Sequence, residues 1–255
     1  MRNVLAIAGR ELRAYFASPI GWVVLCLWVL IMGIFFVAVL GIYNMQATEM
    51  AYNPYAGSEM NIDEYLVAPL FGNTSVILLF ICPLMTMRLF AEDRKSKSLE
   101  LLLTSPITTT EIVLGKYLGA FGFFAIVLLG TVHMPALLFW MGEPDPGVMA
   151  SSYLAVLLLG GCFLAVGLMT SSMTENQIVA AVLSFGLLLA LWIVGWFEEL
   201  ASGTLKEVFS YASLINRMED MTKGLIHTQD LVYYLSFIFF FLFATHQRVE
   251  AYRWR

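Results

Sequence analysis

The chain has 255 residues, of which 60% are hydrophobic and only 13% are charged, and its mean hydropathy is +0.79. Because soluble domains carry roughly 25% charged and 45–50% apolar residues, this composition excludes a water-soluble globular protein. The formal net charge of −5 argues against the basic surface that nucleic-acid binding needs. Cys26, Cys82 and Cys162 lie inside apolar runs, which argues against a disulfide or a metal site. We therefore predict a single membrane domain over residues 1–255.

Uninterrupted apolar runs predict six transmembrane helices, each close to the roughly 20 residues that cross a hydrocarbon core of about 30 Å. The predicted spans are residues 20–43, 69–87, 117–141, 152–171, 178–197 and 229–247. The sixth prediction is the weakest, because the apolar centre of that span, residues 231–245, would cover only about 22 Å as a helix. Polar side chains at its ends would have to snorkel to the interfaces. The alternative is a helix that enters the membrane only half way.

Basic residues in the connecting segments predict the orientation, since lysine and arginine gather on the cytoplasmic side. All but three of the 14 basic residues precede the first span, lie between the second and third, or follow the sixth. The loops 44–68 and 142–151 contain none, but several acids. Both termini are therefore predicted to be cytoplasmic. The segment 198–228, which holds the three remaining basic residues, is expected to cap the outer face.

The predicted spans contain few polar side chains, and these argue against an intramembrane enzyme. A paired aspartate, a Ser/His couple and an H-E-x-x-H pattern are missing from the runs, so no catalytic residue is predicted. Possible pathway-lining residues are Asn73, Thr74, Ser75, His133, Gln177 and Ser184. His133 precedes Pro135, which would loosen the helix, and it either contacts a proton or substrate or bonds to a neighbouring helix. The other residues either line a path or bond to their own helices.

Leu114-Gly115-Lys116 resembles the end of a phosphate-binding loop, but the rest of the motif is missing. Thr110 stands where the required glycine would be, and Tyr117 instead of serine or threonine follows the lysine. This chain is therefore not expected to bind a nucleotide in that way. Any energy from ATP must come through a partner.

The segment between the second and third spans is the strongest functional signal. Residues 92–103 begin with charges and end with leucines, so they predict a short helix that Pro106 ends. As a helix, this segment could present Leu99, Leu102 and Leu103 to another surface. Thr108 and Glu111, three residues apart, predict a capping box that begins the next helix. A short cytoplasmic helix bounded by turns would let a membrane domain sense a moving soluble partner; the alternative is a mere polar connection.

Several segments resemble the permease subunits of ABC-2 type transporters. Residues 83–92, 98–107 and 111–117 are similar to the cytoplasmic loop of that family, although Lys97 stands where the family usually has glycine. Four further segments, 10–12, 18–21, 174–180 and 230–236, resemble the gliding-motility (Gld-type) permease branch. The resemblance extends over essentially the whole chain.

This resemblance implies an all-α, type V exporter-like permease fold in a bacterial plasma (inner) membrane, surrounded by lipid. It implies two permeases side by side, identical or homologous, each docked to an ATP-binding subunit that holds ATP and Mg. The Gld-type branch adds an auxiliary subunit with a large outer domain. No cofactor is implied in this chain itself.

The resemblance also implies roles for particular residues. Residues 1–17 would form an interfacial amphipathic helix in which Arg10 and Arg13 face water and Glu11 bridges to a coupling element at residues 92–106. The implied ATPase-coupling residues are Glu92, Arg94, Lys95, Leu99, Glu100, Leu102, Leu103 and Pro106. Two functions are compatible with these roles. The chain is either a permease half of an ATP-driven exporter or a transducer that passes force to an outer protein without transporting anything.

Overall fold

A computed structural model describes residues 2–52, 61–104, 106–200 and 210–253, together with Gly203 and Lys206. Within these residues the regular structure is helical. Six helical segments are long and apolar enough to cross a membrane. They are Pro19–Met50, Asp63–Lys95, Thr109–Met141, Pro146–Met173, Gln177–Gly195 and Thr228–Arg253. The prediction of an all-α protein with six membrane spans is therefore confirmed.

In chain order the helices are α1 (Arg2–Ala17), α2 (Pro19–Tyr52), η1 (Asp63–Val67), α3 (Ala68–Gly72), α4 (Thr74–Thr86), α5 (Ala91–Lys95), α6 (Ser98–Thr104), α7 (Thr109–Leu129), α8 (His133–Met141), α9 (Pro146–Met173), α10 (Gln177–Leu200), α12 (Leu214–Thr222) and α13 (Thr228–Arg253). The second span combines η1, α3, α4 and α5, and the third combines α7 and α8. The sixth span, α13, has 26 residues and therefore reaches about 39 Å. That length crosses a hydrocarbon core completely, so the half-inserted alternative is not needed.

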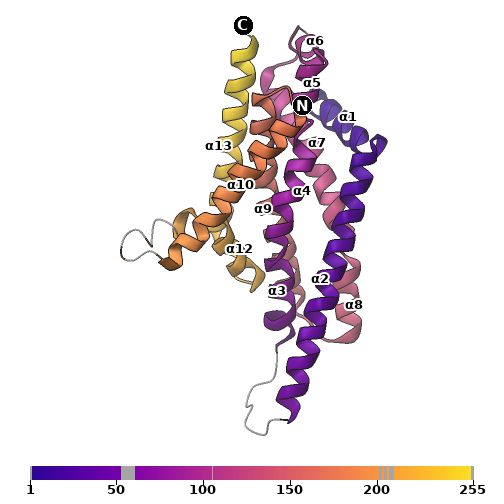
Figure 1. The fold of residues 1–255 in the computed structure, drawn as a ribbon, viewed down its shortest axis with the longest axis vertical. Helices are drawn as coiled ribbons and strands as arrows, with labels where there is room; N and C mark the ends of the chain where they lie inside the picture. The colour runs from indigo at the N-terminus through magenta and orange to yellow at the C-terminus, as the bar shows by residue number, and fades with distance from the viewer. Residues whose placement is uncertain are drawn as a thin grey trace.

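Both ends of the chain lie at one end of the bundle, on the same side as α5 and α6 (Figure 1). The distribution of lysine and arginine predicts that this end is cytoplasmic, and we refer to it as the cytoplasmic end. At the opposite end α2 extends furthest, whereas α12 lies level with the middle of the long helices (Figure 1). Within the segment expected to cap the outer face, α12 packs against the sides of α9 and α10 rather than beyond their ends.

Helix α9 is the centre of the bundle. Of its most hydrophobic stretch, 78% is buried, and α4, α7, α10, α12 and α13 all pack against it. A Cβ atom placed on Gly160 would lie 2.2 Å from the ring of Phe124, and one on Gly167 would lie 2.1 Å from Oγ1 of Thr86. Small residues let helices approach closely in lipid, where packing rather than hydrophobic exclusion drives association. The glycines of α9 therefore fix how closely α4 and α7 approach it.

Local motifs define where α7 and α2 begin. The N–H of Glu111 donates to Oγ1 of Thr108 at 3.3 Å, and the N–H of Thr108 donates to the Glu111 carboxylate at 3.1 Å. The predicted capping box is therefore confirmed. Helix α2 begins at Pro19, directly after α1. At this corner Gly21 is required, since a Cβ there would lie 2.1 Å from the carbonyl oxygen of Tyr15.

Candidate cytoplasmic coupling site

Two short helices, α5 and α6, form the cytoplasmic connection between the second and third spans. Lys97 lies in the turn between them with φ of 57°, the one non-glycine residue with positive φ in the described part of the chain. Side chains other than glycine disfavour this left-handed conformation by roughly 1–2 kcal/mol. Lys97 thus has a backbone conformation that favours glycine. It also stands at the position where the family that this sequence resembles usually has glycine.

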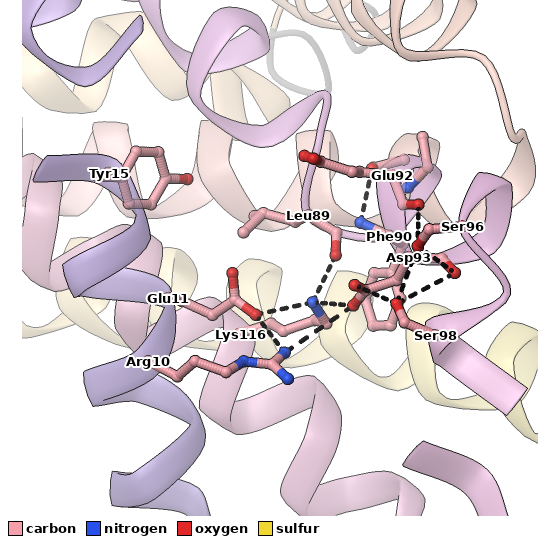
Figure 2. A network of polar contacts seen from close by, with 12 residues as sticks. Arg10, Glu11, Tyr15, Leu89, Phe90, Glu92, Asp93, Ser96, Ser98 and Lys116 are labelled. Atoms are coloured by element: carbon pink, nitrogen blue, oxygen red, sulfur yellow. Dashed lines mark hydrogen bonds and ion pairs between the residues drawn. The ribbon is translucent and has the colours of Figure 1, made fainter. Parts of the chain in front are cut away.

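The ammonium group of Lys116, on α7, lies at the centre of the site and is only 1% exposed. Its Nζ lies 2.9 Å from Oε1 of Glu11 and 2.6 Å from Oδ2 of Asp93, and it donates to the carbonyl of Leu89 at 2.5 Å. Figure 2 shows these three oxygens converging on the nitrogen. The ammonium group donates hydrogen bonds to Glu11 and Leu89, and it forms an ion pair with Asp93. Lys116 therefore joins α1, α5 and α7.

Arg10 completes the network at its edge. Its Nη2 lies 2.7 Å from the Glu11 carboxylate and 4.0 Å from that of Asp93, and half of its side chain is exposed. On the other side, Ser98 Oγ donates to Oδ1 of Asp93 at 2.8 Å. We call Arg10, Glu11, Asp93 and Lys116 the Lys116 cluster; its two cations and two anions cancel formally (Figure 2).

Two glycines of α7 bring α1 close enough to reach Lys116. A Cβ on Gly115 would lie 2.6 Å from Cβ of Ile7, and one on Gly119 would lie 2.6 Å from Cβ of Glu11. Ile7, Glu11 and Tyr15 form the buried face of α1. Gly115 and Lys116 resembled the end of a phosphate-binding loop in the sequence. In the structure, Gly115 packs against α1 and Lys116 forms the ion network.

Tyr15 makes a second contact between α1 and the second span. Its hydroxyl donates to the carbonyl of Met85 at 2.6 Å, and its ring stacks on Phe123 with centroids 4.4 Å apart. The guanidinium carbon of Arg88 lies 4.3 Å from the centre of the same ring. Burial raises the pKa of the Tyr15 phenol, so its proton remains available for the hydrogen bond.

The connection is also attached to the cytoplasmic end of α9. Oγ of Ser171 accepts from the N–H groups of Phe90 and Ala91, at 3.1 and 3.2 Å, and donates to the carbonyl of Met87 at 3.0 Å. These bonds satisfy backbone groups where α4 has ended and α5 begins. Residues 87–91 therefore follow any movement of α9.

Arg94 extends the attachment to α9 and α13. Its Nη1 donates to the carbonyl of Ser172 at 2.9 Å, and its Nη2 lies 3.3 Å from the Glu175 carboxylate. The guanidinium carbon lies 5.0 Å from the centre of the Tyr252 ring on α13. The predicted coupling segment therefore contacts α1, α7, α9 and α13.

The remaining predicted coupling residues fall into two groups. Glu92, Lys95, Glu100 and Pro106 are exposed, as is Arg13 on α1. Leu99 is only 2% exposed, so contrary to expectation it faces the interior of the protein rather than a partner. Leu102 is half-buried and packs against the core, and the side chain of Leu103 lies outside the described residues. Among the leucines of α6 whose side chains are described, Leu101 is the one that projects; it is 74% exposed and was not predicted as a coupling residue.

The polar residues expected to line a path are not gathered in one place. Those of the second span bond to their own helix: Asn73 to the carbonyl of Pro69 at 2.8 Å, Thr74 to that of Leu70 at 3.2 Å, and Ser75 to that of Gly72 at 3.0 Å. Asn73 and Ser75 also line a cavity of about 450 Å³ beside α10 and α12. His133 is exposed and lies 2.9 Å from the carbonyl of Gly130, Gln177 is half-buried, and Ser184 is buried.

A second buried ion pair lies at the opposite end of α13. Nη1 of Arg217, on α12, lies 2.5 Å from Oδ1 of Asp230. The same guanidinium lies over the rings of Tyr211 and Tyr233, at 4.7 and 4.3 Å from their centres. This pair attaches α12 to α13. No three histidine, cysteine, aspartate or glutamate side chains of the described residues are grouped so as to hold a metal ion.

We expect Lys116→Met to lower the free energy of unfolding by about 3 kcal/mol, because Glu11 and Asp93 would stay largely buried and would keep only the half-exposed Arg10 as a counter-charge. The measurement is thermal or denaturant unfolding of the full chain in detergent. Lys95→Met is the matched control, since Lys95 is exposed on α5. Equal effects of the two substitutions would contradict the central place of Lys116.

Comparison with known proteins agrees with this architecture. The model of the ABC-2 family transporter proteins matches residues 5–238, which is most of the chain. No curated protein matches the chain. Members of this permease family usually lack catalytic activity of their own, and the family implies an ABC ATPase as partner. The chain belongs to the ABC-2 family of transporter membrane proteins.

Proposed function

We propose that this chain is the permease half of an exporter in a bacterial plasma membrane, powered by ATP hydrolysis in a separate subunit. The observation that carries the proposal is the Lys116 cluster, because it ties the cytoplasmic helix α5 to α1 and α7 through a buried ammonium group. This observation supports coupling to the ATP-binding subunit, whereas export is the direction that the resemblance to type V exporters implies.

The proposed coupling element is α5 with α6. The ATP-binding subunit would contact the exposed residues of this element, which include Leu101, Glu92 and Glu100. A push on α5 would act on α1 and α7 through Lys116, and on α9 and α13 through Arg94. Packed elements linked in this way move as units rather than deform continuously.

A second permease is the proposed partner within the membrane. Only 17% of the most hydrophobic stretch of α10 is buried, although α10 is a membrane span. Beside it, α4 exposes one stripe, Val76, Phe80 and Leu84, and both α2 and α10 pack against α4. We call the surface of α2, α4 and α10 around this stripe the α4 face. A homodimer through the α4 face would cover a stripe that is otherwise left to lipid.

A force transducer of the Gld-type branch is the alternative. Two observations favour it. The 34 residues of α2 reach about 51 Å, which exceeds a hydrocarbon core of about 30 Å. The outer end of α2 exposes Met45 and Tyr52, where an auxiliary subunit with an outer domain could dock. In addition, Asn73, Thr74 and Ser75 bond to their own helix. On this alternative, ATP turnover proceeds without movement of a solute across the bilayer.

We expect Leu101→Asp to weaken binding of the ATP-binding subunit. A leucine buried at an interface contributes about 1.5–3 kcal/mol, so the affinity should fall by roughly ten- to a hundredfold. The measurement is co-purification of the ATP-binding subunit with the chain, followed by ATP hydrolysis of the complex in lipid.

Leu225→Asp is the control for this substitution, because Leu225 is also exposed but lies in the segment between α12 and α13, away from the cytoplasmic end. Glu92→Lys combined with Leu101→Asp should remove the stimulation of ATP hydrolysis altogether. Unchanged co-purification and unchanged hydrolysis in the double variant would overturn the coupling assignment.

The proposed homodimer can be tested by crosslinking in native membranes. In a Cys26→Ser background, only the buried Cys82 and Cys162 remain. We expect Phe80→Cys in this background to give covalent dimers with a short bismaleimide, because the two α4 faces oppose each other. Phe240→Cys on α13, at a similarly exposed position, should stay monomeric. Equal yields of covalent dimer from the two positions would contradict an interface at the α4 face. A crosslink to another membrane protein of similar size would indicate that the partner is a homologous permease.

A further inference from the structure

The turn between α5 and α6 holds Lys97 in a conformation that suits glycine. Its φ of 57° is left-handed, which costs free energy for a residue with a Cβ atom. Contacts on both sides fix the turn: the N–H of Lys97 donates to the carbonyl of Arg94 at 3.1 Å, and Oγ of Ser96 lies 3.1 Å from Oγ of Ser98. These contacts use no atom of the lysine side chain, so a glycine at this position would form the same turn.

The charge of Lys97 is a second disadvantage at this place. Lys97 directly precedes Ser98, the first residue of α6, and the free N–H groups at the beginning of a helix disfavour a neighbouring cation. The side chain is exposed. Within the described residues its ammonium group makes no hydrogen bond and no ion pair. In the described part of the chain, therefore, no contact of the lysine side chain offsets these two costs.

The surroundings of Lys97 indicate what kind of surface could supply a compensating contact. Helices α5 and α6 lie at the cytoplasmic end of the bundle (Figure 1). Leu101, which is 74% exposed, follows Lys97 by four residues, about one helical turn. Glu92 and Glu100 are also exposed on this element, and an anionic lipid surface would repel them. A protein surface that has a carboxylate beside an apolar pocket fits these residues better than a membrane surface does.

We propose that Lys97 is a recognition residue for the ATP-binding subunit, whose surface presents a carboxylate to its ammonium group at the rim of the pocket that receives Leu101. Strained backbone conformations persist where binding uses them. A charge at the rim of an interface mainly raises the rate of association and selects among partners. Lys97 therefore favours a subunit that carries an acidic residue at this point over one that carries a basic residue. The inference rests on the proposed function, because it names the chemistry of the surface that α6 would contact.

Lys97→Gly separates the cost of the lysine from its use. In the full chain in detergent, we expect this substitution to raise the melting temperature by about 2 °C, because glycine adopts the turn without strain. In phosphatidylcholine nanodiscs, we expect the same variant to bind the ATP-binding subunit about fivefold more weakly, as for the loss of one exposed ion pair. A melting temperature that falls together with the affinity would overturn the proposal, since Lys97 would then stabilise the turn itself.

Association kinetics test the electrostatic role of Lys97. Lys97→Glu should slow association with the ATP-binding subunit by about tenfold at low salt, and the difference from the unaltered chain should shrink at high salt. Lys223→Glu is the control, because it changes the net charge equally, but Lys223 is exposed after α12, away from the cytoplasmic end. Equal slowing by the two substitutions would mean that net charge alone acts, and the recognition role of Lys97 would be overturned.

Leu101→Asp distinguishes failure of this inference from failure of the proposed function. If Leu101→Asp weakens binding and Lys97→Gly does not, the coupling surface stands and the role of Lys97 is overturned. If neither substitution weakens binding, the proposed function fails, and the inference fails with it. An effect of Lys97→Gly that appears only in phosphatidylglycerol nanodiscs would assign the ammonium group to a lipid phosphate, which would also overturn the proposal.

Discussion

The position of the cytoplasmic helices depends on a single buried ammonium group. Lys116 is surrounded by protein, and a cation in such a place is tolerated only with good counter-charges and hydrogen bonds. Glu11 and Asp93 provide the charges and the Leu89 carbonyl provides a further acceptor. Since these groups come from α1 and from the second span, the helices that carry them cannot move away from α7 independently. Separating these helices would cost free energy, because it would leave the buried ammonium group of Lys116 without its counter-charges.

The rest of the bundle divides into a packed part and an open part. Helices α4, α7 and α9 interlock through glycines that admit side chains of a neighbour, such as Gly160 with Phe124. Helices α2, α10 and α13 instead bury a much smaller share of their membrane stretches, 28%, 17% and 22%. Cores packed at close distance have few intermediate arrangements, whereas exposed apolar faces accept lipid or another protein. We therefore expect the packed helices α4, α7 and α9 to transmit a movement that begins at α5. The less buried helices α2, α10 and α13 would then be displaced.

The sequence predicted what is determined locally. Membrane spans follow from the length of apolar runs, and the Thr108–Glu111 capping box follows from two residue types three positions apart. The prediction that Leu99 faces a partner was wrong, because the direction in which α6 presents its leucines depends on the turn at Lys97. Leu99 is buried and Leu101 projects. The direction of these side chains depends on how α6 packs in the folded protein, so it cannot be predicted from the order of the leucines in the sequence.

From the sequence, Lys116 was considered only as the lysine of an incomplete phosphate-binding loop. In the structure it is the centre of a buried ion network. The usable signal was a lysine directly before a long apolar run, with glycines at positions 115 and 119 on either side of it. A lysine so placed either snorkels to water or finds a buried anion, and glycines on one helix face indicate a closely packed neighbour. The partner acids, Glu11 and Asp93, lie far away in the chain, so only the fold identifies them.

Inter-helix ion pairs occur at two levels of the described structure, the Lys116 cluster and the pair of Arg217 with Asp230. Between these levels, Asn73, Thr74 and Ser75 of the second span bond to carbonyls of their own span, and Thr74 also donates to Sδ of Met32 on α2. Helix α13 is attached at both levels, since Tyr252 lies under Arg94 and Asp230 binds Arg217. A continuous helix of 26 residues transmits a displacement of one end to the other. We therefore expect a push on α5 to reach α12 through α13, which would act as a rigid rod.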